Sequence, residues 1–362
     1  MKKALYLTLA LGVLLSLPSC TNTPETIAEP VNIVFGKLYD EEKEAKIEEH
    51  LKTLDGEGFA SKLQNKEEFA LLIYDKSNPK WDEYEKAILK FVKKENALIH
   101  AMELSAFKRI KTSVSVDTKE GEITLAILED GNVACQIMSG GENDLLLDAD
   151  ALSTYLEERV HFSDMLYISL EQLEEVFTKK NDATIGFLRK TCLDCSFVED
   201  AVLTPFNYLD HQQSYVIDCD VEGIRYKDGE IDEEGWKEFK KKYGLSEEGN
   251  ADFGYNGGYV PTFFHYSTDG KTSPAESILD GCVYLNDTVE NVNGEYLVTD
   301  SYFTEEREPL LNFLGNIPDK ETVLKGHKVA TQEIENGHWK KECAAKYHNP
   351  LLRAFLDAYL SK

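Results

Sequence analysis

The stretch that decides the fold is Phe187-Leu188-Arg189-Lys190-Thr191-Cys192-Leu193-Asp194-Cys195. An apolar run precedes it at residues 184–188 and predicts a short buried strand, and the residues after it predict a helix. Unpaired N–H groups at a helix N-terminus stabilise a thiolate and lower a cysteine pKa from about 8.5 to between about 3.5 and 7.5. Two intervening residues let the second sulfur reach back to the first. The sequence therefore predicts Cys192 as an attacking thiol and Cys195 as a resolving thiol.

The residues around this stretch alternate between strand and helix patterns. Ser169 and Gln172 have the spacing of a capping box and open the first of the predicted helices. Helices are predicted over residues 169–179, 233–243 and 350–360, and strands over 184–188, 215–218, 262–266 and 278–285.

An earlier part of the chain repeats the order. Strands are predicted over residues 69–74, 97–104, 123–128 and 133–137, and helices over 81–92 and 148–160. A further helix over 40–54 is expected to end at Gly56 and Gly58. Alternating strands and helices that finish in a hairpin predict an α/β fold, a tandem of two related units with mixed central sheets and helices on both faces.

The first residues have the features of an export signal. Lys2 and Lys3 precede an apolar run over residues 4–17, and Leu17-Pro18-Ser19-Cys20 follows at once. This ending resembles the lipobox of bacterial lipoproteins, in which the cysteine becomes the acylated N-terminus after cleavage. The resemblance implies a signal peptide over 1–19, lipid on Cys20 and a place in the cell envelope on the extracytoplasmic side of a membrane. A tether is predicted over 20–40, a first domain over 41–162 and a second domain over 163–362.

The charge excludes several classes of partner. The chain has 362 residues, 39 Lys+Arg and 66 Asp+Glu, a formal charge of −27. Such a chain is repelled by nucleic acid and by anionic lipid heads, so lipid on Cys20 would hold it at a membrane. A hydrophobic content of 42% excludes general disorder.

The number of cysteines agrees with lipid attachment at Cys20. Of seven cysteines, reserving Cys20 for lipid leaves six, and only Cys192 and Cys195 are close in sequence. Disulfides are permitted outside the cytoplasm, but the sequence does not give the pairing of the other four, which are Cys135, Cys219, Cys282 and Cys343.

Three features in register resemble the thioredoxin superfamily: the strand and CxxC motif quoted above, a central strand at residues 215–218, and Val260-Pro261-Thr262 before the next strand. The resemblance implies that Pro261 is a cis proline beside the active cysteines and that the backbone at Val260 pairs with a substrate chain. Val260, Pro261 and Thr262 are thus the expected substrate-binding residues. The partners implied are exported or cell-surface proteins with cysteines, and no cofactor is expected.

The chain departs from that family in three places. The buried acid that thioredoxin carries six residues before the first cysteine is Gly186 here, and the aromatic residue before the motif is Thr191. The interval between Cys195 and Pro261 is long. Asp194 opposes thiolate formation whereas Arg189 and Lys190 favour it, so the redox direction is left open.

Other patterns give weaker predictions. Residues 218–223 (DCDVEG) resemble the start of a calcium loop, but the twelfth position is Gly229 where glutamate is required, so a solvated acidic loop is predicted. Cys219 and His265 lack metal-ligand spacing with the CxxC motif, and no metal site is predicted. In the first unit Asn78-Pro79-Lys80-Trp81 aligns with the CxxC motif and Ile123 with Pro261, which predicts a degenerate unit that supplies binding surface or spacing.

Two functions are compatible with these residues. The first is a membrane-anchored thiol-disulfide oxidoreductase that uses Cys192 and Cys195 on exported proteins. The second is a non-catalytic surface binding lipoprotein in which thioredoxin-like units are scaffolds and the CxxC motif is a structural disulfide.

Overall fold

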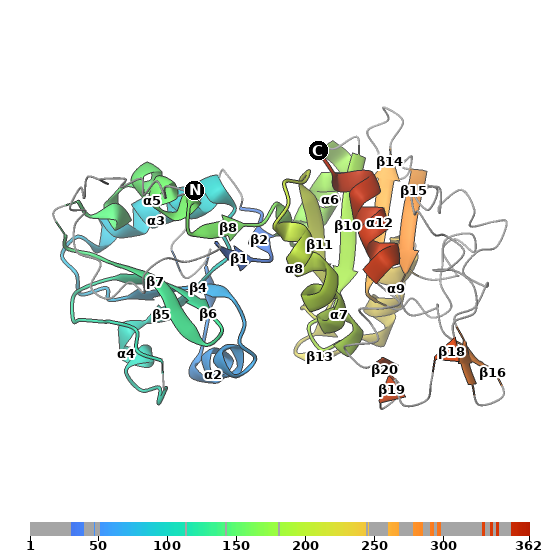
Figure 1. Cartoon of the computed structure of the whole chain (residues 1–362), viewed down its shortest axis with the longest axis horizontal. Coiled ribbons are helices and arrows are strands. Elements are labelled where there is room, and N and C mark those ends of the chain that lie inside the picture. Colours follow the sequence, from blue (N-terminus) through green and yellow to red (C-terminus); the bar gives the residue numbers. More distant parts are fainter. Residues whose placement is uncertain are drawn as a thin grey trace, which may run out of the picture.

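The computed structural model contains two α/β units, shown in Figure 1 as a blue-to-green half and a green-to-red half. It describes residues 30–39, 47, 51–112, 114–141, 143–179, 182–243, 245, 260–267, 278–284, 290–292, 295–297, 328–329, 334–335, 338–339 and 349–362. The predicted signal peptide, Cys20 and most of the helix predicted over 40–54 lie outside these residues.

The first unit is built on a five-stranded sheet of order β3-β5-β4-β6-β7. Its strands are β3 (Lys52–Thr53), β4 (Phe69–Tyr74), β5 (Ile99–Glu103), β6 (Thr124–Glu129) and β7 (Asn132–Met138). The helices are α2 (Gly56–Gln64), α3 (Trp81–Glu95), α4 (Leu104–Phe107) and α5 (Ala149–Glu157), with a 3-10 turn at Leu145–Leu147. β3, β4 and β5 are parallel, whereas β6 and β7 are antiparallel to their neighbours.

Strand β4 shows why this unit has helices on both faces. All six of its residues are buried, and successive side chains of a strand point to opposite faces. Ala70, Leu72 and Tyr74 pack in one core with residues of α3 and α5. The alternate residues, with Phe69 first, pack in a second core with residues of α2 and α4. A strand buried on both sides has to be apolar throughout, as this one is.

The second unit is built on a six-stranded sheet of order β15-β14-β10-β11-β9-β2. Its own strands are β9 (Met165–Tyr167), β10 (Asp182–Leu188), β11 (Ser214–Asp218), β14 (Thr262–Ser267) and β15 (Ile278–Tyr284). The helices are α6 (Leu170–Lys179), α7 (Leu193–Val198), a π turn at Glu199–Leu203, α8 (Thr204–Asn207), α9 (Glu233–Lys242) and α12 (Asn349–Leu360). A small hairpin, β12 (Tyr226–Lys227) and β13 (Glu230–Ile231), precedes α9.

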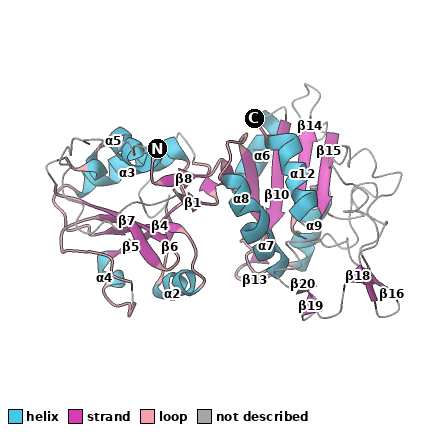
Figure 2. Ribbon diagram, in the orientation of Figure 1, coloured by secondary structure: helices cyan, strands magenta, loops and turns pink. Residues whose placement is uncertain are grey.

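Helices cover both faces of this sheet as well. Phe187 of β10 makes ring contacts with Phe239 and Tyr243 at the end of α9, and Phe177 of α6 contacts Tyr243, so α6 and α9 share one face. Figure 2 shows α7, α8 and α12 over the face turned to the viewer. Beyond β15 the described residues form short strands, β16 (Glu290–Val292), β17 (Glu295–Leu297), β18 (Lys328–Val329), β19 (Ile334–Glu335) and β20 (His338–Trp339).

Both sheets have the same strand order. In each unit the first strand pairs with the third, the third with the second, the second with the fourth, and the fourth with the fifth. The predicted α/β fold, with two related units and mixed sheets, is therefore confirmed.

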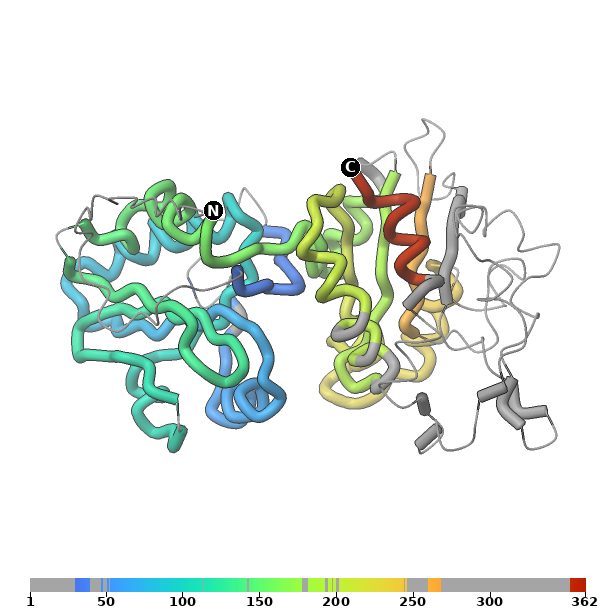
Figure 3. The backbone as a smooth tube through the Cα atoms, in the orientation of Figure 1, coloured from blue at the N-terminus to red at the C-terminus, as the bar shows by residue number. Residues whose placement is uncertain are grey.

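The tether prediction is wrong for the last part of the range 20–40. Residues 31–39 belong to the folded structure: β1 (Val31–Ile33) pairs with β8 (Val160–Phe162), and β2 (Gly36–Lys37) joins the second unit's sheet beside β9. Figure 3 shows this segment in dark blue between the two units. Val31, Ile33 and Phe35 are buried.

The segment is also tied by hydrogen bonds to both units. Asn32 Nδ2 donates to the Thr204 carbonyl of the second unit at 2.8 Å, and the N–H of Asn32 donates to the Glu68 carboxylate of the first unit at 2.8 Å. At Gly36 a Cβ atom would lie 2.7 Å from the Asn96 carbonyl oxygen, so the close approach requires glycine.

Candidate active site: the Cys192–Cys195 pair

The two cysteines lie where β10 ends and α7 begins. Cys192 is the N-cap residue of α7, and its carbonyl oxygen accepts from the N–H of Ser196 at 3.2 Å. Cys192 is half-buried, whereas Cys195, one turn further along, is 4% exposed. Neither cysteine forms a disulfide in the structure. The predicted start of the helix at the motif is confirmed, and one sulfur is more accessible than the other.

Cys192 is brought against the proline predicted from the resemblance. The Val260–Pro261 peptide bond is cis, and Cys192 Sγ lies 3.5 Å from the Val260 carbonyl oxygen. Thr262 begins β14 and pairs with Phe187, the penultimate residue of β10, which places the two segments side by side. Val260 is 4% exposed and Thr262 is 0% exposed. The predicted substrate-binding residues Val260 and Thr262 are therefore buried, and Thr262 pairs with β10 on one side and with β15 on the other.

The thiol of Cys195 is in a different environment. Burial raises the pKa of Cys195 well above its usual range, and the adjacent Cys192 sulfur raises it further. The N–H of Arg189 donates to Cys195 Sγ at 3.4 Å and acts in the opposite direction. Cys195 is thus predominantly protonated in the dithiol form near neutral pH.

Asp220 fixes the loop that leads into the cysteines. One carboxylate oxygen of Asp220 accepts from Arg189 Nε at 3.1 Å and from a terminal nitrogen of Arg225 at 2.6 Å. The other accepts from the N–H of Thr191 at 3.0 Å and from its hydroxyl at 2.6 Å. Burial alone would raise the pKa of Asp220, but the hydrogen bonds from Thr191, Arg225 and Arg189 outweigh it and lower the pKa to about 2. The carboxylate stays charged throughout the neutral range.

Asp218 acts on the same loop. Lys190 Nζ lies 2.6 Å from a carboxylate oxygen of Asp218, and the N–H of Asp220 donates to the other at 3.0 Å. The prediction of a solvated acidic loop at residues 218–223 is therefore wrong for Asp218 and Asp220, whose side chains are 9% and 4% exposed. The positive charges of Arg189 and Lys190 are therefore compensated by Asp220 and Asp218. The two basic residues fix the loop more than they favour a thiolate at Cys192.

Gly186 leaves no room for an acid behind the cysteines. A Cβ atom at Gly186 would lie 2.6 Å from Cε1 of Phe263, so the Phe263 ring fills that side of β10. A side chain at this position would have to displace a buried aromatic ring.

The first unit has the corresponding loops without the thiols. Helix α3 begins at Trp81 after β4, as α7 begins after β10. Asn78 Nδ2 donates to the Gly121 carbonyl at 2.5 Å, which draws the loop before α3 toward the segment that carries buried Ile123. Among the described residues of this unit the one cysteine is Cys135 on β7, whose sulfur lies 3.8 Å from the Tyr155 hydroxyl.

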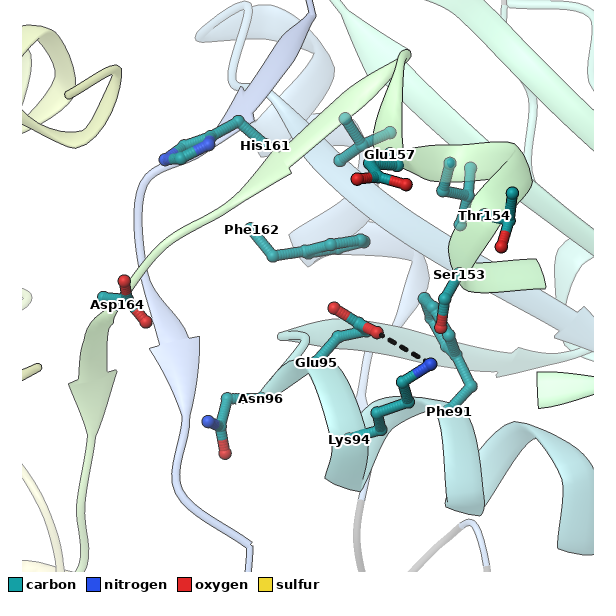
Figure 4. Close-up of a pocket in the computed structure, with 12 residues that line it drawn as sticks. Phe91, Lys94, Glu95, Asn96, Ser153, Thr154, Glu157, His161, Phe162 and Asp164 are labelled. Atoms are coloured by element: carbon teal, nitrogen blue, oxygen red, sulfur yellow. Dashed lines mark ion pairs between the residues drawn. The ribbon is translucent and has the colours of Figure 1, made fainter. Parts of the chain in front are cut away.

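A pocket of about 470 Å³ lies in the first unit between α3, α5 and β8. Figure 4 shows its polar lining, with Lys94 paired to Glu95 and with His161 and Asp164 on the opposite side. Its lining includes neither cysteine of the candidate site nor Val260 or Pro261. The Cys192–Cys195 pair of the candidate site lies in the second unit.

Comparisons with known proteins return structures and no sequence match. No protein-family model matches the chain, and no curated protein matches it. Human ERp44 (form II) is 11% identical, with a TM-score of 0.29 over 60% of this chain and 50% of that chain, so the match spans half of the ERp44 chain. The bb fragment of ERp72 is 12% identical, with a TM-score of 0.27 over 64% and 88%. The first two thioredoxin domains of Eps1p from Naumovozyma dairenensis are 11% identical, with a TM-score of 0.24 over 64% and 91%.

The described residues contain neither a candidate membrane span nor a candidate metal centre. In that part of the chain, no helix combines the length and hydropathy needed to cross a membrane. Nor do the described residues contain a group of three or more His, Cys, Asp or Glu side chains arranged around a metal position. His265, considered above for zinc, stacks on Tyr359 and has Nδ1 2.9 Å from the Thr184 hydroxyl.

Proposed function

We propose that the chain is a thiol-disulfide oxidoreductase that acts on cystines of exported or cell-surface proteins. The observation that carries the proposal is the half-buried Cys192 thiol at the start of α7, 3.5 Å from the Val260 carbonyl, with the buried Cys195 thiol one turn behind it. An accessible sulfur attacks or is attacked, and a shielded one resolves the intermediate.

In the reductive direction the Cys192 thiolate attacks one sulfur of a substrate cystine. A Cys192–substrate disulfide forms, and the substrate's other sulfur leaves as a thiolate and takes a proton. Cys195 then attacks Cys192 Sγ, the Cys192–Cys195 disulfide forms, and the second substrate sulfur leaves. The substrate gains two electrons and the protein loses two, so the protein ends in the disulfide form. An external dithiol has to reduce it before the next turnover. Oxidation of a substrate dithiol is the same sequence in reverse.

The site favours this chemistry over a purely structural role for the motif. Asp218 and Asp220 fix the loop before Cys192 by ion pairs and hydrogen bonds to Lys190, Arg189 and Thr191. A half-buried thiol that is held in place at the start of a helix is what disulfide exchange with another chain requires. The first unit, with corresponding loops and no thiol pair, is proposed to supply binding surface or spacing.

The same proposal places the protein at a membrane through lipid on Cys20. The lipobox-like residues before Cys20 support acylation, and a formal charge of −27 opposes direct adsorption to anionic lipid heads. Lipidated on the extracytoplasmic side, the chain would meet newly exported proteins whose cysteines are still being paired.

The experiment that tests the proposed activity captures the substrate. With Cys195→Ser the second attack is removed, so a substrate stays attached to Cys192 and is detected by intact mass or by a reducible band shift. The chain is expressed in a bacterial envelope, and free thiols are alkylated before lysis.

The matched control for this capture is the double variant Cys192→Ser/Cys195→Ser, which has to capture nothing. Reducible adducts with Cys195→Ser and none with the double variant are the expected result. Equal capture by both variants, or none by either, would favour the alternative of a non-catalytic binding lipoprotein.

A further inference from the structure

A small cavity lies beside Cys195. Its volume is about 50 Å³, and its polar lining includes Tyr167, Lys190, Glu199 and Asp218 together with Cys195. A volume of roughly 15 Å³ or more is enough for one water molecule when two to four polar partners surround it. Cys195 and the carboxylates of Glu199 and Asp218 therefore line one space that is large enough for water.

The chemistry of Cys195 requires a base nearby. Burial raises the pKa of this thiol, yet only its thiolate attacks a disulfide. The proton of Cys195 has to leave before the mixed disulfide is resolved. The strand behind the motif supplies no acceptor, because Gly186 carries no side chain and Phe263 fills the space.

Glu199 is placed to meet this need. It follows Cys195 by four residues, and its N–H donates to the Cys195 carbonyl, so the two side chains lie on the same face of the helix. Glu199 is half-buried and begins the π turn that interrupts the helix. Single π turns within helices occur frequently at functional sites.

Asp218 is a weaker candidate for the same role. Its two carboxylate oxygens are engaged by Lys190 at 2.6 Å and by the N–H of Asp220 at 3.0 Å. Tyr167 lines the same cavity and remains protonated, since burial and then the charges on Glu199 and Asp218 raise its pKa well above the usual range.

We propose that Glu199 accepts the proton of Cys195, directly or through a water molecule in this cavity, when the mixed disulfide is resolved. The inference rests on the proposed oxidoreductase function. The Cys195 S–H bond breaks and its proton passes to the Glu199 carboxylate. The freed thiolate attacks Cys192 Sγ, the Cys192–Cys195 bond forms, and the substrate sulfur leaves as a thiolate. Glu199 returns the proton to solvent.

Several charged or titratable groups face this cavity and set its pH response. Besides Glu199, they are Tyr167 from β9, Arg189 and Lys190 from the loop after β10, Cys195 of the motif, and Asp218 at the end of β11. Glu199 accepts a proton only as a carboxylate, so resolution is expected to slow in acid.

The test separates the two steps of the reaction. The reduced full chain is mixed with a disulfide-linked pair of peptides and quenched with acid at millisecond intervals, and mass spectrometry counts the mixed disulfide and the oxidised protein. With Glu199→Gln, formation of the mixed disulfide at Cys192 is expected to stay within twofold. Its resolution at pH 7 is expected to slow by about 100-fold.

The pH profile distinguishes proton transfer from a structural effect. With Glu199→Gln the resolution rate is expected to rise about tenfold per pH unit toward alkaline pH, because solvent hydroxide then has to remove the proton. The unmodified chain is expected to level off at lower pH. Glu199→Asp keeps a carboxylate and is expected to retain part of the rate. Glu238→Gln on α9, an exposed glutamate of the same unit, is the matched control and leaves both steps unchanged.

Two results separate failure of this inference from failure of the proposed function. Resolution by Glu199→Gln at the unmodified rate across pH 6 to 9 would overturn the role of Glu199 and leave the oxidoreductase proposal intact. Absence of any mixed disulfide with the unmodified chain would overturn the proposed function and the role of Glu199 with it.

Discussion

Replacing Cys192 with serine is expected to reduce the turnover of a peptide disulfide by about a thousandfold or more. A serine hydroxyl is not ionised near neutral pH and forms no disulfide, so neither step of the exchange has a nucleophile. Among the cysteines of this unit whose burial is described, the other two thiols, Cys195 and Cys219, are both buried. The measurement is the initial rate of cleavage of a self-quenched peptide pair joined by a disulfide, with dithiothreitol as the final reductant.

The matched control for Cys192→Ser is Cys135→Ala in the first unit. Cys135 is buried on β7, far along the chain from the motif, and this variant is expected to keep turnover within about twofold. Retention of more than a tenth of the activity by Cys192→Ser would contradict the assignment of the nucleophile. An equal loss with Cys135→Ala would show that folding, rather than chemistry, had been measured.

Replacing Cys20 with serine is expected to move the chain from the membrane fraction to the soluble fraction of a bacterial envelope. Each buried CH₂ group of a lipid chain contributes roughly 0.8 kcal/mol to membrane binding, so removing the acylated cysteine removes the whole anchor. The surface of a chain with a formal charge of −27 offers no electrostatic substitute. The measurement is fractionation by ultracentrifugation followed by the intact mass of the mature chain.

Two observations decide the anchoring prediction. The unmodified chain is expected to carry lipid mass on a first residue that was Cys20, and Cys135→Ala is expected to stay with the membrane. Membrane retention of Cys20→Ser in high salt, or an unmodified chain without lipid mass, would contradict lipid anchoring.

Strands buried on both faces were the most predictable part of the fold. β4 covers Phe69–Tyr74, the range that its apolar run predicts, and β10 and β11 extend their predicted ranges by at most two residues. The capping box is confirmed: Ser169 N–H donates to Gln172 Oε1 at 3.0 Å, and Gln172 N–H donates to Ser169 Oγ at 3.2 Å. Local signals of this kind need no knowledge of distant partners.

Short strands with distant partners were not predictable. β1 and β2 have three and two residues, and Val31 pairs with Val160 whereas Gly36 pairs with Leu166. Segments so short carry no periodicity, and the Thr-, Pro- and Glu-rich residues before them indicate a tether. The predicted helix stop at Gly56 is wrong for a related reason: Asp55 accepts from the N–H of Gly58 at 2.7 Å and starts α2 there.

The candidate site was predictable in part. The resemblance implies a cis proline at residue 261, and the structure has a cis Val260–Pro261 bond with the Val260 carbonyl 3.5 Å from Cys192 Sγ. The resemblance says nothing of Asp218 and Asp220. A signal for these acids was present, because β10 and β11 are adjacent parallel strands and their carboxyl ends meet at one edge of the sheet. Basic residues after one strand and acidic residues after the other are therefore brought together. The role of Glu199 depends on a cavity, which only packing reveals.

The redox equilibrium of Cys192 and Cys195 in the unmodified chain tests the central claim most directly. The chain is equilibrated in thiol–disulfide buffers of graded potential, and free thiols are then alkylated. Mass spectrometry measures the fraction of the peptides carrying the two cysteines that is alkylated and the fraction that is disulfide-bonded. The account predicts a reversible two-electron transition between about −270 and −120 mV, the range of protein thiol oxidoreductases. A pair that stays oxidised below about −300 mV would be a structural disulfide and would contradict it.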